Sequence, residues 1–400
     1  MAGLPLAGLK VVDLTWVVVG PSAIRVLADF GATVVHVESG VRVDTARTVS
    51  PYKGGKPDPA MSVLSANVNA NKFGLQLNLA TAAGRDVLSK LAAWADVLAE
   101  SFTPKAMRAW GLDYGALREI NPTLIMLSTC LDGATGPLAD FAGFGNLGAA
   151  LAGFGDYWGW PDRAPAGPAG AYTDYVAPRF ITAAILGALE HRRRTGEGQH
   201  IDLSQAEAAM HFLTLAILRY GVDGKVIERA GNADPVMCPH GVYPCQGTDR
   251  WVAIACQTPR EWPKLADLIG EEARDPRFDT LLGRRRHAAD LDAVIAAWTA
   301  ELEDRVVERL CQERGIAAHS VIDSADALAE PHLKDHFAWM EQSAMGEIPV
   351  EGPRIRLSRT PAAVRTPGPA LGQDNEVVLK ELLGLSDEEV VDLVVAGALD

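Results

Sequence analysis

The sequence contains few cysteines, and they follow no recognisable pattern. Five occur in 400 residues, at Cys130, Cys238, Cys245, Cys256 and Cys311. An odd number at irregular spacing does not suit a disulfide framework and is typical of reduced thiols in an intracellular protein. Cys238 and Cys245 flank His240, but no second ligand pair with zinc-like spacing accompanies them. We therefore expect no metal site.

Long apolar runs and an excess of positive charge are also missing. No uninterrupted hydrophobic stretch reaches the roughly 18–20 residues that a membrane-spanning helix needs. The N-terminal segment MAGLPLAGLKVVDLT lacks a basic region followed by an apolar core and a cleavage site. A formal net charge of −14 argues against a nucleic-acid surface. We expect a cytoplasmic protein with no membrane or nucleic-acid partner, although a few local cations suffice to hold a small polyanion.

Strand and helix signals alternate along the first half of the chain. Lys10–Leu14 predicts a strand, a helix follows from the Gly20-Pro21 turn to about Phe30, and Thr33–Val37 predicts a second strand. Similar units continue to about residue 128, which favours an α/β fold with a doubly wound parallel sheet. The first turn lacks a G-x-G-x-x-G motif, so no dinucleotide cofactor is indicated.

The segment from Gly170 to Ser204 is the most informative about chemistry. Asp174 follows a glycine- and proline-rich loop and precedes an apolar helix that ends in a basic run and Gly196. A carboxylate at the mouth of a loop, near a helix N-terminus, is well placed to be a nucleophile. From this segment alone, a simple N-cap role for Asp174 is equally compatible with the pattern.

Further motifs are spread over most of the chain in a fixed order. They are Leu6–Thr15, Gly20-Pro21, Leu27–Glu38, Asn71-Lys72, Ala95–Phe102, Asn121-Pro122 and Gly133–Pro137. Together with the Asp174 segment, they resemble class III CoA-transferases, the family of formyl-CoA transferase and carnitine CoA-transferase, whose fold is shared by α-methylacyl-CoA racemase.

The resemblance implies a domain layout and an assembly. It implies a large Rossmann-like CoA-binding domain over residues 1–205, a linker helix over 206–230 and a small α+β domain over 231–330. Residues 331–400 would return to the large domain. Family members form interlocked homodimers, so we expect the chain to be a homodimer.

The resemblance also implies the reaction. The substrates would be an acyl-CoA and a carboxylic acid, with the coenzyme A thioester as substrate and no bound prosthetic group. Asp174 matches the family's nucleophile, which passes through an aspartyl anhydride and an aspartyl-CoA thioester. Gly143 and Gly145 are candidates to bring backbone N–H donors to the oxyanion, although simple turns explain them equally well.

The resemblance assigns CoA contacts to positions along the chain. They are Val18, Val19, Ser39, Lys72, Leu75, Leu77, Ser101, Phe102, Arg108, Leu131, Asp132, Gly133 and Ala134. Ser39 stands where an arginine often binds phosphate, and Arg108 is a candidate to compensate. A solvated helix charge is the competing interpretation of Arg108.

Trp158 and Trp160 lie in a Gly/Pro-rich loop ahead of Asp174. They would either form a lid over a bulky acyl group or pack against a neighbouring subunit.

Two alternative functions are considered. A racemase would need a histidine where this chain has Phe144, which cannot exchange a proton. A non-catalytic CoA-binding protein is the other alternative.

Overall fold

The structure, a computed structural model, describes residues 3–168 and 170–400. The chain divides into two compact units. The first comprises Met1–Gly155, Gly167–Ile227 and Asp335–Asp400, and the second comprises Asp156–Ala166 and Glu228–Lys334. Residues 156–166 thus belong to the second unit, although the sequence placed them in the large domain. They are held there because Arg229 binds the Asp156 carboxylate at 2.6 Å and the Trp160 ring packs on Gly231.

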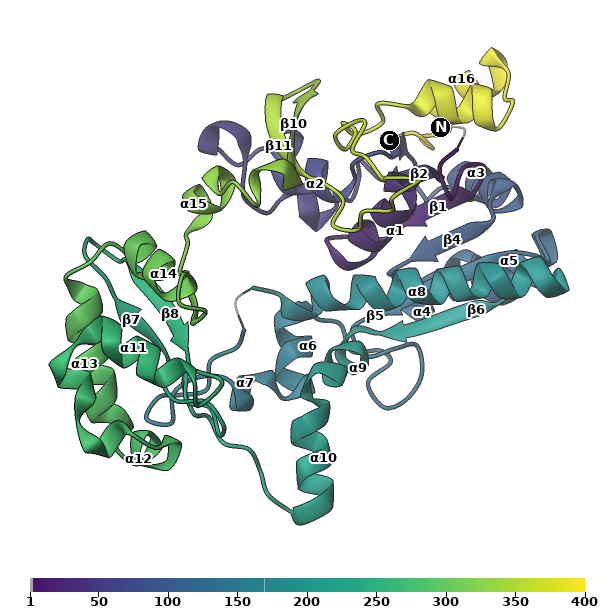
Figure 1. Cartoon of the computed structure of the whole chain (residues 1–400). Helices are drawn as coiled ribbons and strands as arrows, with labels where there is room; N and C mark the ends of the chain where they lie inside the picture. The colour runs from purple at the N-terminus through teal and green to yellow at the C-terminus, as the bar shows by residue number, and fades with distance from the viewer. Residues whose placement is uncertain (1–2, 169) are drawn as a thin grey trace. The chain divides into compact units, whose positions relative to one another are not determined.

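A six-stranded parallel sheet forms the centre of the first unit (Figure 1). Its strands are β1 (Lys10–Leu14), β2 (Thr33–Glu38), β3 (Phe73–Gln76), β4 (Val97–Glu100), β5 (Ile125–Cys130) and β6 (His200–Ser204). The spatial order is β3-β2-β1-β4-β5-β6, so the winding direction reverses between β1 and β4. In such sheets the carboxyl ends of the strands at the reversal form the binding crevice.

Helices cover both faces of this sheet. One face packs on α3 (Ala82–Trp94), α4 (Pro104–Trp110), α5 (Tyr114–Ile120) and the π-helix η8 (Val377–Leu382). The other packs on α1 (Val19–Asp29) and α8 (Tyr172–Thr195). Because both faces are buried, the strands consist largely of apolar residues rather than alternating with polar ones.

The rest of the first unit consists of short elements. They include α2 (Val63–Val68), α6 (Gly145–Ala152), α9 (Gln205–Met210), α10 (Thr214–Asp223), the hairpin β10 (Phe337–Gln342) and β11 (Gly346–Glu351), and α16 (Asp387–Val395). The short helix α7 (Phe154–Tyr157) begins in the first unit and ends in the second. Where the resemblance implied one linker helix over 206–230, the chain forms α9, a short 3-10 turn and α10. None of the residues of α10 is buried.

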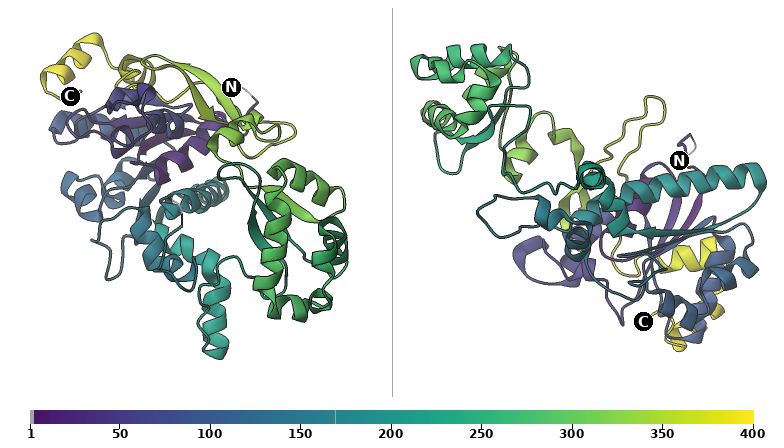
Figure 2. Two further views of the ribbon diagram at one scale, coloured as in Figure 1. Left: turned by 90° about the vertical axis from the view of Figure 1, so that its left-hand side faces the viewer. Right: turned by 90° about the horizontal axis from the view of Figure 1, so that it is seen from below.

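The second unit is a small α+β fold (Figure 2). Its antiparallel strands lie in the order β7 (His240–Pro244), β8 (Trp251–Ala255) and β9 (Ala317–Ser320). The helices are α11 (Glu261–Ile269), α12 (Leu281–Arg286), α13 (Ala288–Ala300), α14 (Asp304–Gln312) and α15 (Ser324–Ala329). The core of this unit forms where α11, α13 and α14 pack on the inner side of β8.

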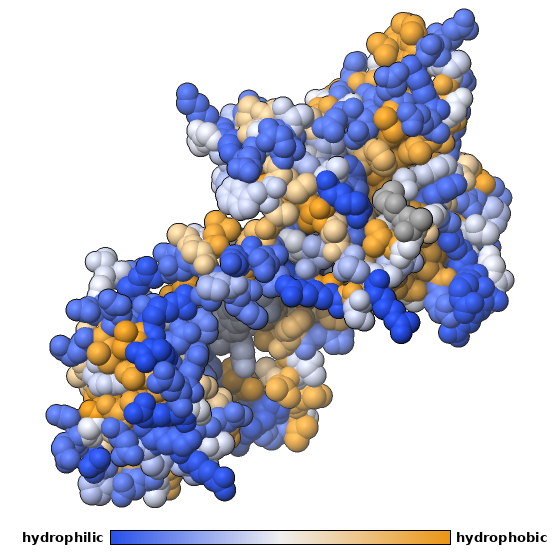
Figure 3. Space-filling view, turned by 45° about the horizontal axis from the view of Figure 1, so that its top comes forward, coloured by the Kyte–Doolittle hydropathy of each residue, from blue (hydrophilic) through white to orange (hydrophobic). Residues whose placement is uncertain are grey.

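The surface is mixed in character. On the face that Figure 3 shows, hydrophobic patches interrupt a largely hydrophilic surface.

All five cysteines carry free thiols. Within residues 3–168 and 170–400, no helix combines the length and the apolar composition that crossing a membrane requires.

Candidate active site

Asp174 lies in the first turn of α8. The helix begins at Tyr172, and Ala171 occupies the N-cap position, so Asp174 is the third helical residue. The N-cap interpretation of Asp174 is therefore wrong. An acidic side chain in the first turn still lies at the positive end of the helix dipole, which favours its ionised form.

The Asp174 carboxylate is almost enclosed by protein. The residue is 6 % exposed, and burial raises the pKa of Asp174 to about 6. The Thr173 hydroxyl, 3.5 Å from Asp174 Oδ1, opposes part of this increase. At neutral pH the group is a carboxylate with little solvation, which makes it a stronger nucleophile than a hydrated one.

A second helix begins against this carboxylate. Helix α6 starts at Gly145, and a Cβ atom built on Gly145 would lie 2.1 Å from Asp174 Oδ1. The Thr173 hydroxyl also lies 3.2 Å from the Gly145 carbonyl oxygen, to which it donates. Only glycine permits this approach of backbone to carboxylate. The backbone at the beginning of α6 is thereby placed next to the Asp174 carboxylate.

A cavity of about 540 Å³ opens where Asp174 lies. It is formed at the carboxyl ends of β1, β4 and β5, which is the reversal point of the sheet. Its lining includes the loop after β1 (Trp16, Val17, Val18, Val19), residues after β4 (Ser101, Phe102, Thr103), the end of β5 (Thr129, Cys130, Leu131), the start of α6 (Gly143, Phe144, Gly145, Leu147) and Gln205.

Many of the predicted contact residues meet at this place. Val18, Val19, Ser101, Phe102, Leu131, Gly143 and Gly145 line the cavity together with Asp174. A smaller cavity of about 150 Å³ shares Phe102 with it and is lined by Ser39 and Leu77. These predicted positions therefore form one continuous region of the first unit.

Lys72 is not available to a ligand. Its side chain is fully buried, and its ammonium group bonds Asp13 at 2.7 Å, the Pro21 carbonyl at 2.9 Å and Asn69 at 2.8 Å. The expectation that Lys72 holds the nucleotide fails because this cation already neutralises a buried carboxylate. Leu75 is likewise wholly buried in the sheet core.

Other predicted positions lie outside both cavities. Arg108 is exposed on α4 and does not line either of them, so it does not compensate for Ser39 in this structure. Asp132, Gly133 and Ala134 belong to the loop after β5 and also line neither cavity. There the Ala134 N–H donates to the Asp202 carboxylate at 2.9 Å, which fixes the loop.

Arg42 is a cation that sequence reasoning missed. It lines both cavities, and its guanidinium lies 5.1 Å from the centroid of the Trp16 ring. Arg42 follows Ser39 by three residues in the loop after β2. A search for any arginine in that loop, rather than at one aligned position, would have found it.

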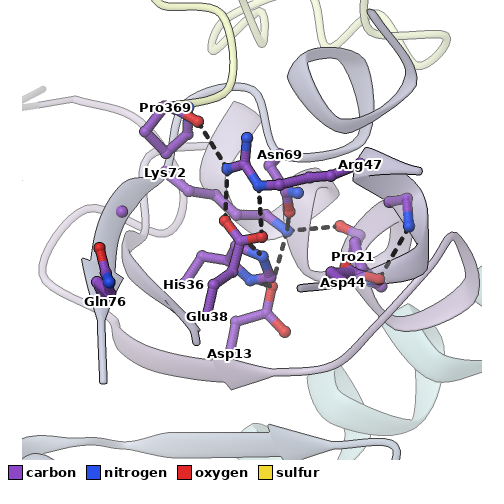
Figure 4. A network of polar contacts seen from close by, with 12 residues as sticks. Asp13, Pro21, His36, Glu38, Asp44, Arg47, Asn69, Lys72, Gln76 and Pro369 are labelled. Carbon is purple, nitrogen blue, oxygen red and sulfur yellow. Dashed lines mark hydrogen bonds and ion pairs between the residues drawn. The ribbon is translucent and has the colours of Figure 1, made fainter. Parts of the chain in front are cut away.

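A buried ion network supports the loop that carries Val18 and Val19 (Figure 4). Asp13 pairs with Lys72 and with His36 Nδ1, the latter at 3.1 Å. Burial opposes ionisation of Asp13, yet the charges of Lys72 and His36 hold its pKa below the ordinary value. The Glu38 carboxylate receives two hydrogen bonds from Arg47, at 2.7 and 2.6 Å.

Asp44 connects the network to the cavity wall. Its carboxylate accepts the Val17 N–H at 3.0 Å, and Val17 has a φ of 65°. A β-branched residue rarely adopts this left-handed conformation, so the hydrogen bond holds a strained loop in place. The Trp16 N–H, which donates to Ser101 Oγ at 2.9 Å, fixes the other side of the loop.

The network also contains the only group with a metal-ligand composition that the described residues provide. His36, Glu38 and Asp44 present ligand atoms within 4.8 Å of one another. Glu38 is already held by Arg47, and Asp44 by backbone N–H groups. We therefore assign these three residues to the ion network.

Trp158 and Trp160 belong to the second unit, whereas Asp174 belongs to the first. Trp160 packs on Gly231, and the Arg163 guanidinium lies 5.5 Å from its ring centroid. The idea that these tryptophans cover an acyl group stays a prediction.

Comparisons with known proteins identify the family of the chain. The chain matches CoA-transferase family III over residues 6–375. It is 33% identical to a succinyl-CoA–D-citramalate CoA-transferase of Chloroflexus aurantiacus, over 97% of this chain and 96% of that protein. It is 30% identical to a succinate–glutarate CoA-transferase of Agrobacterium fabrum, over 94% of this chain and 96% of that protein.

A solved structure gives the same result. The crystal structure of a CAIB/BAIF family protein from Brucella suis superposes with a TM-score of 0.87 at 31% identity, covering 95% of this chain and all of that one. Both sequence and fold are thus shared over nearly the whole length. The chain belongs to CoA-transferase family III and is an enzyme of that class.

Proposed function

We propose that the enzyme moves CoA from an acyl-CoA to a carboxylic acid through covalent intermediates on Asp174. The observation that carries the proposal is the Asp174 carboxylate, enclosed at the beginning of two helices and lining the cavity at the sheet reversal. Related CoA-transferases of this family act on succinyl-CoA, as their names state.

The proposed chemistry needs only bond exchange at carbonyl carbons. Asp174 Oδ attacks the thioester carbon, the C–S bond breaks with its electrons on sulfur, and a mixed anhydride and CoA thiolate result. The thiolate then attacks the aspartyl carbonyl, which releases the donor acid as a carboxylate and leaves an aspartyl-CoA thioester. The acceptor carboxylate reverses both steps, regenerating free Asp174 and forming the new acyl-CoA.

Each tetrahedral intermediate carries an oxyanion that requires hydrogen-bond donors. The first-turn N–H groups of α6 begin at Gly145, next to Asp174 Oδ1, and are suited to this role. Thr173, bonded to the Gly145 carbonyl, would hold the two helix ends in register. Removing such a donor typically costs about 10²–10³ in rate.

We propose that CoA lies along the two connected cavities. Its pantetheine arm would pass Val18, Val19 and Leu131 toward Asp174. Arg42, on the wall shared by both cavities, would supply the phosphate contact that Ser39 lacks. Trp16, Phe102 and Trp110 offer aromatic surface for the adenine.

The functional assembly that we propose is a homodimer. Helix α10 exposes a continuous apolar face and has no buried residue among those that the structure describes. Such surfaces are normally covered in the working molecule.

The proposal is tested by supplying succinyl-CoA with a panel of carboxylic acids and identifying the acyl-CoA products by mass spectrometry. Hydroxylamine added during turnover should convert the activated Asp174 to its hydroxamate, detectable in the peptide containing residue 174. Asp174→Asn should abolish both signals and still bind CoA. Transfer by Asp174→Asn within about tenfold of the parent would refute the covalent role.

A further inference from the structure

Three large apolar side chains line the cavity that contains Asp174 and are open to solvent. Phe141 is 50%, Phe144 61% and Leu147 51% exposed, and all three belong to the wall of this cavity. Apolar surface that is left in contact with water costs free energy unless something covers it. Because these side chains lie in a concave site that also holds the reacting carboxylate, a bound acyl group is suited to cover them.

The backbone places this apolar wall next to the reacting carboxylate. Phe144 is the N-cap residue of α6, and a Cβ atom on the next residue would lie 2.1 Å from Asp174 Oδ1. A Cβ atom on Gly143 would lie 2.9 Å from the side chains of both Leu131 and Leu147. Leu131 and Leu147 therefore converge where α6 begins. An acyl group attached to Asp174 would lie against these side chains.

The charges in the cavity do not suit an acyl group with a second carboxylate. Among residues 3–168 and 170–400, the cavity wall contains one cation, Arg42, and one anion, Asp174. Arg42 lies over the Trp16 ring and also lines the smaller cavity, where it would meet a phosphate of CoA. A second carboxylate on the acyl group would thus approach another anion and an apolar wall, and an unpaired charge in such surroundings is costly.

We infer that the enzyme selects monocarboxylic acids with an uncharged apolar chain, and that Phe144 is the specificity-determining contact with that chain. The relatives described above are named for acids that carry two carboxylates, so the inference sets this chain apart from them. It rests on the proposed function, because it takes Asp174 as the acyl acceptor.

The test measures degenerate exchange, in which an isotopically labelled acid enters its own acyl-CoA and mass spectrometry follows the label. Butanoate with butanoyl-CoA and succinate with succinyl-CoA are matched, since their four-carbon chains end in a methyl group or in a carboxylate. We expect kcat/KM of butanoyl-CoA to exceed that of succinyl-CoA by about 10-fold or more. Succinyl-CoA should remain a usable but slower donor.

Variants of Phe144 locate the contact. Phe144→Ala should lower kcat/KM of butanoyl-CoA by about 10-fold and that of succinyl-CoA by less than about threefold. Phe144→Leu, which keeps an apolar side chain, should retain the preference. Leu151→Ala is the matched control, because Leu151 is 55% exposed on the same helix but lines neither cavity, and both exchanges should stay near the parent rate. Circular dichroism and the melting temperature establish that each variant is folded.

Two kinds of result would overturn the inference. The first is a parent enzyme that exchanges succinate as fast as butanoate, or faster. The second is a Phe144→Ala variant with an equal loss on both pairs, or with no loss on either. An equal loss would mean that Phe144 contacts a part of CoA common to both substrates, and no loss would mean that it contacts neither acyl chain.

A binding measurement separates this inference from the proposed function. In the Asp174→Asn background, the Kd of butanoyl-CoA should be about 10-fold lower than that of succinyl-CoA, and adding Phe144→Ala should reduce the difference to less than about threefold. If the parent exchanges neither acid while this binding preference persists, the proposed reaction is wrong and the apolar contact stands. If Asp174→Asn binds the two ligands equally, the contact is wrong whatever the reaction.

Discussion

Asp174 illustrates how one residue balances opposing influences. Burial disfavours its charge and raises its pKa to about 6, while the Thr173 hydroxyl and the position in the first turn of α8 favour the anion. The result is a carboxylate that is ionised at neutral pH yet poorly solvated. That combination suits a group that must attack a thioester and later leave again.

The first prediction is a pH dependence of transfer. Because the nucleophile must be ionised, kcat/KM should decrease about tenfold per pH unit below a midpoint near 6. Steady-state kinetics between pH 4.5 and 8, at constant ionic strength, provides the measurement. A rate that stays level down to pH 4.5 would mean that the pKa of the nucleophile is ordinary or that another step limits turnover.

The second prediction concerns stability. The pKa of Asp174 is higher in the folded protein than its ordinary value of 3.8, so the folded state loses stability as the pH rises from about 4 to about 6. Asp174→Asn removes this cost and should stabilise the protein by about 2–3 kcal/mol at pH 7. The gain should vanish near pH 4. Urea unfolding of parent and variant at pH 4 and pH 7 measures the difference in their free energies of unfolding. If this difference is the same at both pH values, the electrostatic cause is wrong.

At the scale of elements, the meeting of α6 and α8 builds the site. The approach depends on Gly145, whose missing side chain leaves room for the Asp174 carboxylate. Our third prediction is that Gly145→Ala lowers kcat by about 10²-fold or more, since the added Cβ would displace the carboxylate or the α6 N–H groups. Gly187→Ala, where a Cβ meets no atom within 4 Å, is the matched control in α8 and should be nearly neutral. Equal activity in the two variants would remove α6 from the mechanism.

The loop after β1 depends on the buried ion network beneath it. Our fourth prediction is that Lys72→Met destabilises the protein by about 3–5 kcal/mol, because it leaves the buried Asp13 carboxylate short of a partner. Lys105→Met, at an exposed position on α4, is the control and should change stability by less than about 0.5 kcal/mol. Denaturant titration measures both. Normal stability with weakened CoA binding in Lys72→Met would restore Lys72 as a ligand contact.

The sequence predicted strongly periodic elements well. Strand β1 has the bounds that its apolar pattern indicated, and α1 and β2 end within one residue of the predicted positions. The linker helix implied over 206–230 is instead divided into α9, a short 3-10 turn and α10, which ends at Asp223. Apolar periodicity predicts which face of a helix is buried. It does not show whether that face packs against the chain's own core or against another chain.

The site was predictable in part, for a similar reason. Asp174, Val18, Val19 and Phe102 belong to motifs that are local in sequence, and these residues do line one cavity. Lys72 was misassigned because its partner Asp13 lies 59 residues away, and no local pattern reveals that pairing.

At the scale of the whole molecule, α10 is the feature that the single chain leaves unexplained. Leu215 is 81%, Leu218 57% and Val222 86% exposed, and the spacing of these three residues puts them on one side of the helix. Leaving such a face in contact with water costs free energy, because its apolar area is not buried. A second copy of the chain, meeting this face symmetrically, would remove that cost.

The fifth prediction follows from this helix. Sedimentation equilibrium at micromolar concentration should give twice the chain mass of 42.6 kDa. The double variant Leu215→Glu and Leu218→Glu should shift the mass toward one chain or lower the yield of folded protein, because two buried charges would lack partners. Lys105→Glu, which changes an exposed residue on α4, should remain dimeric. A parent protein that sediments as one chain at all concentrations would contradict the assembly. If the double variant remains a dimer with a normal yield, α10 does not lie at the centre of the interface, and the interface is elsewhere.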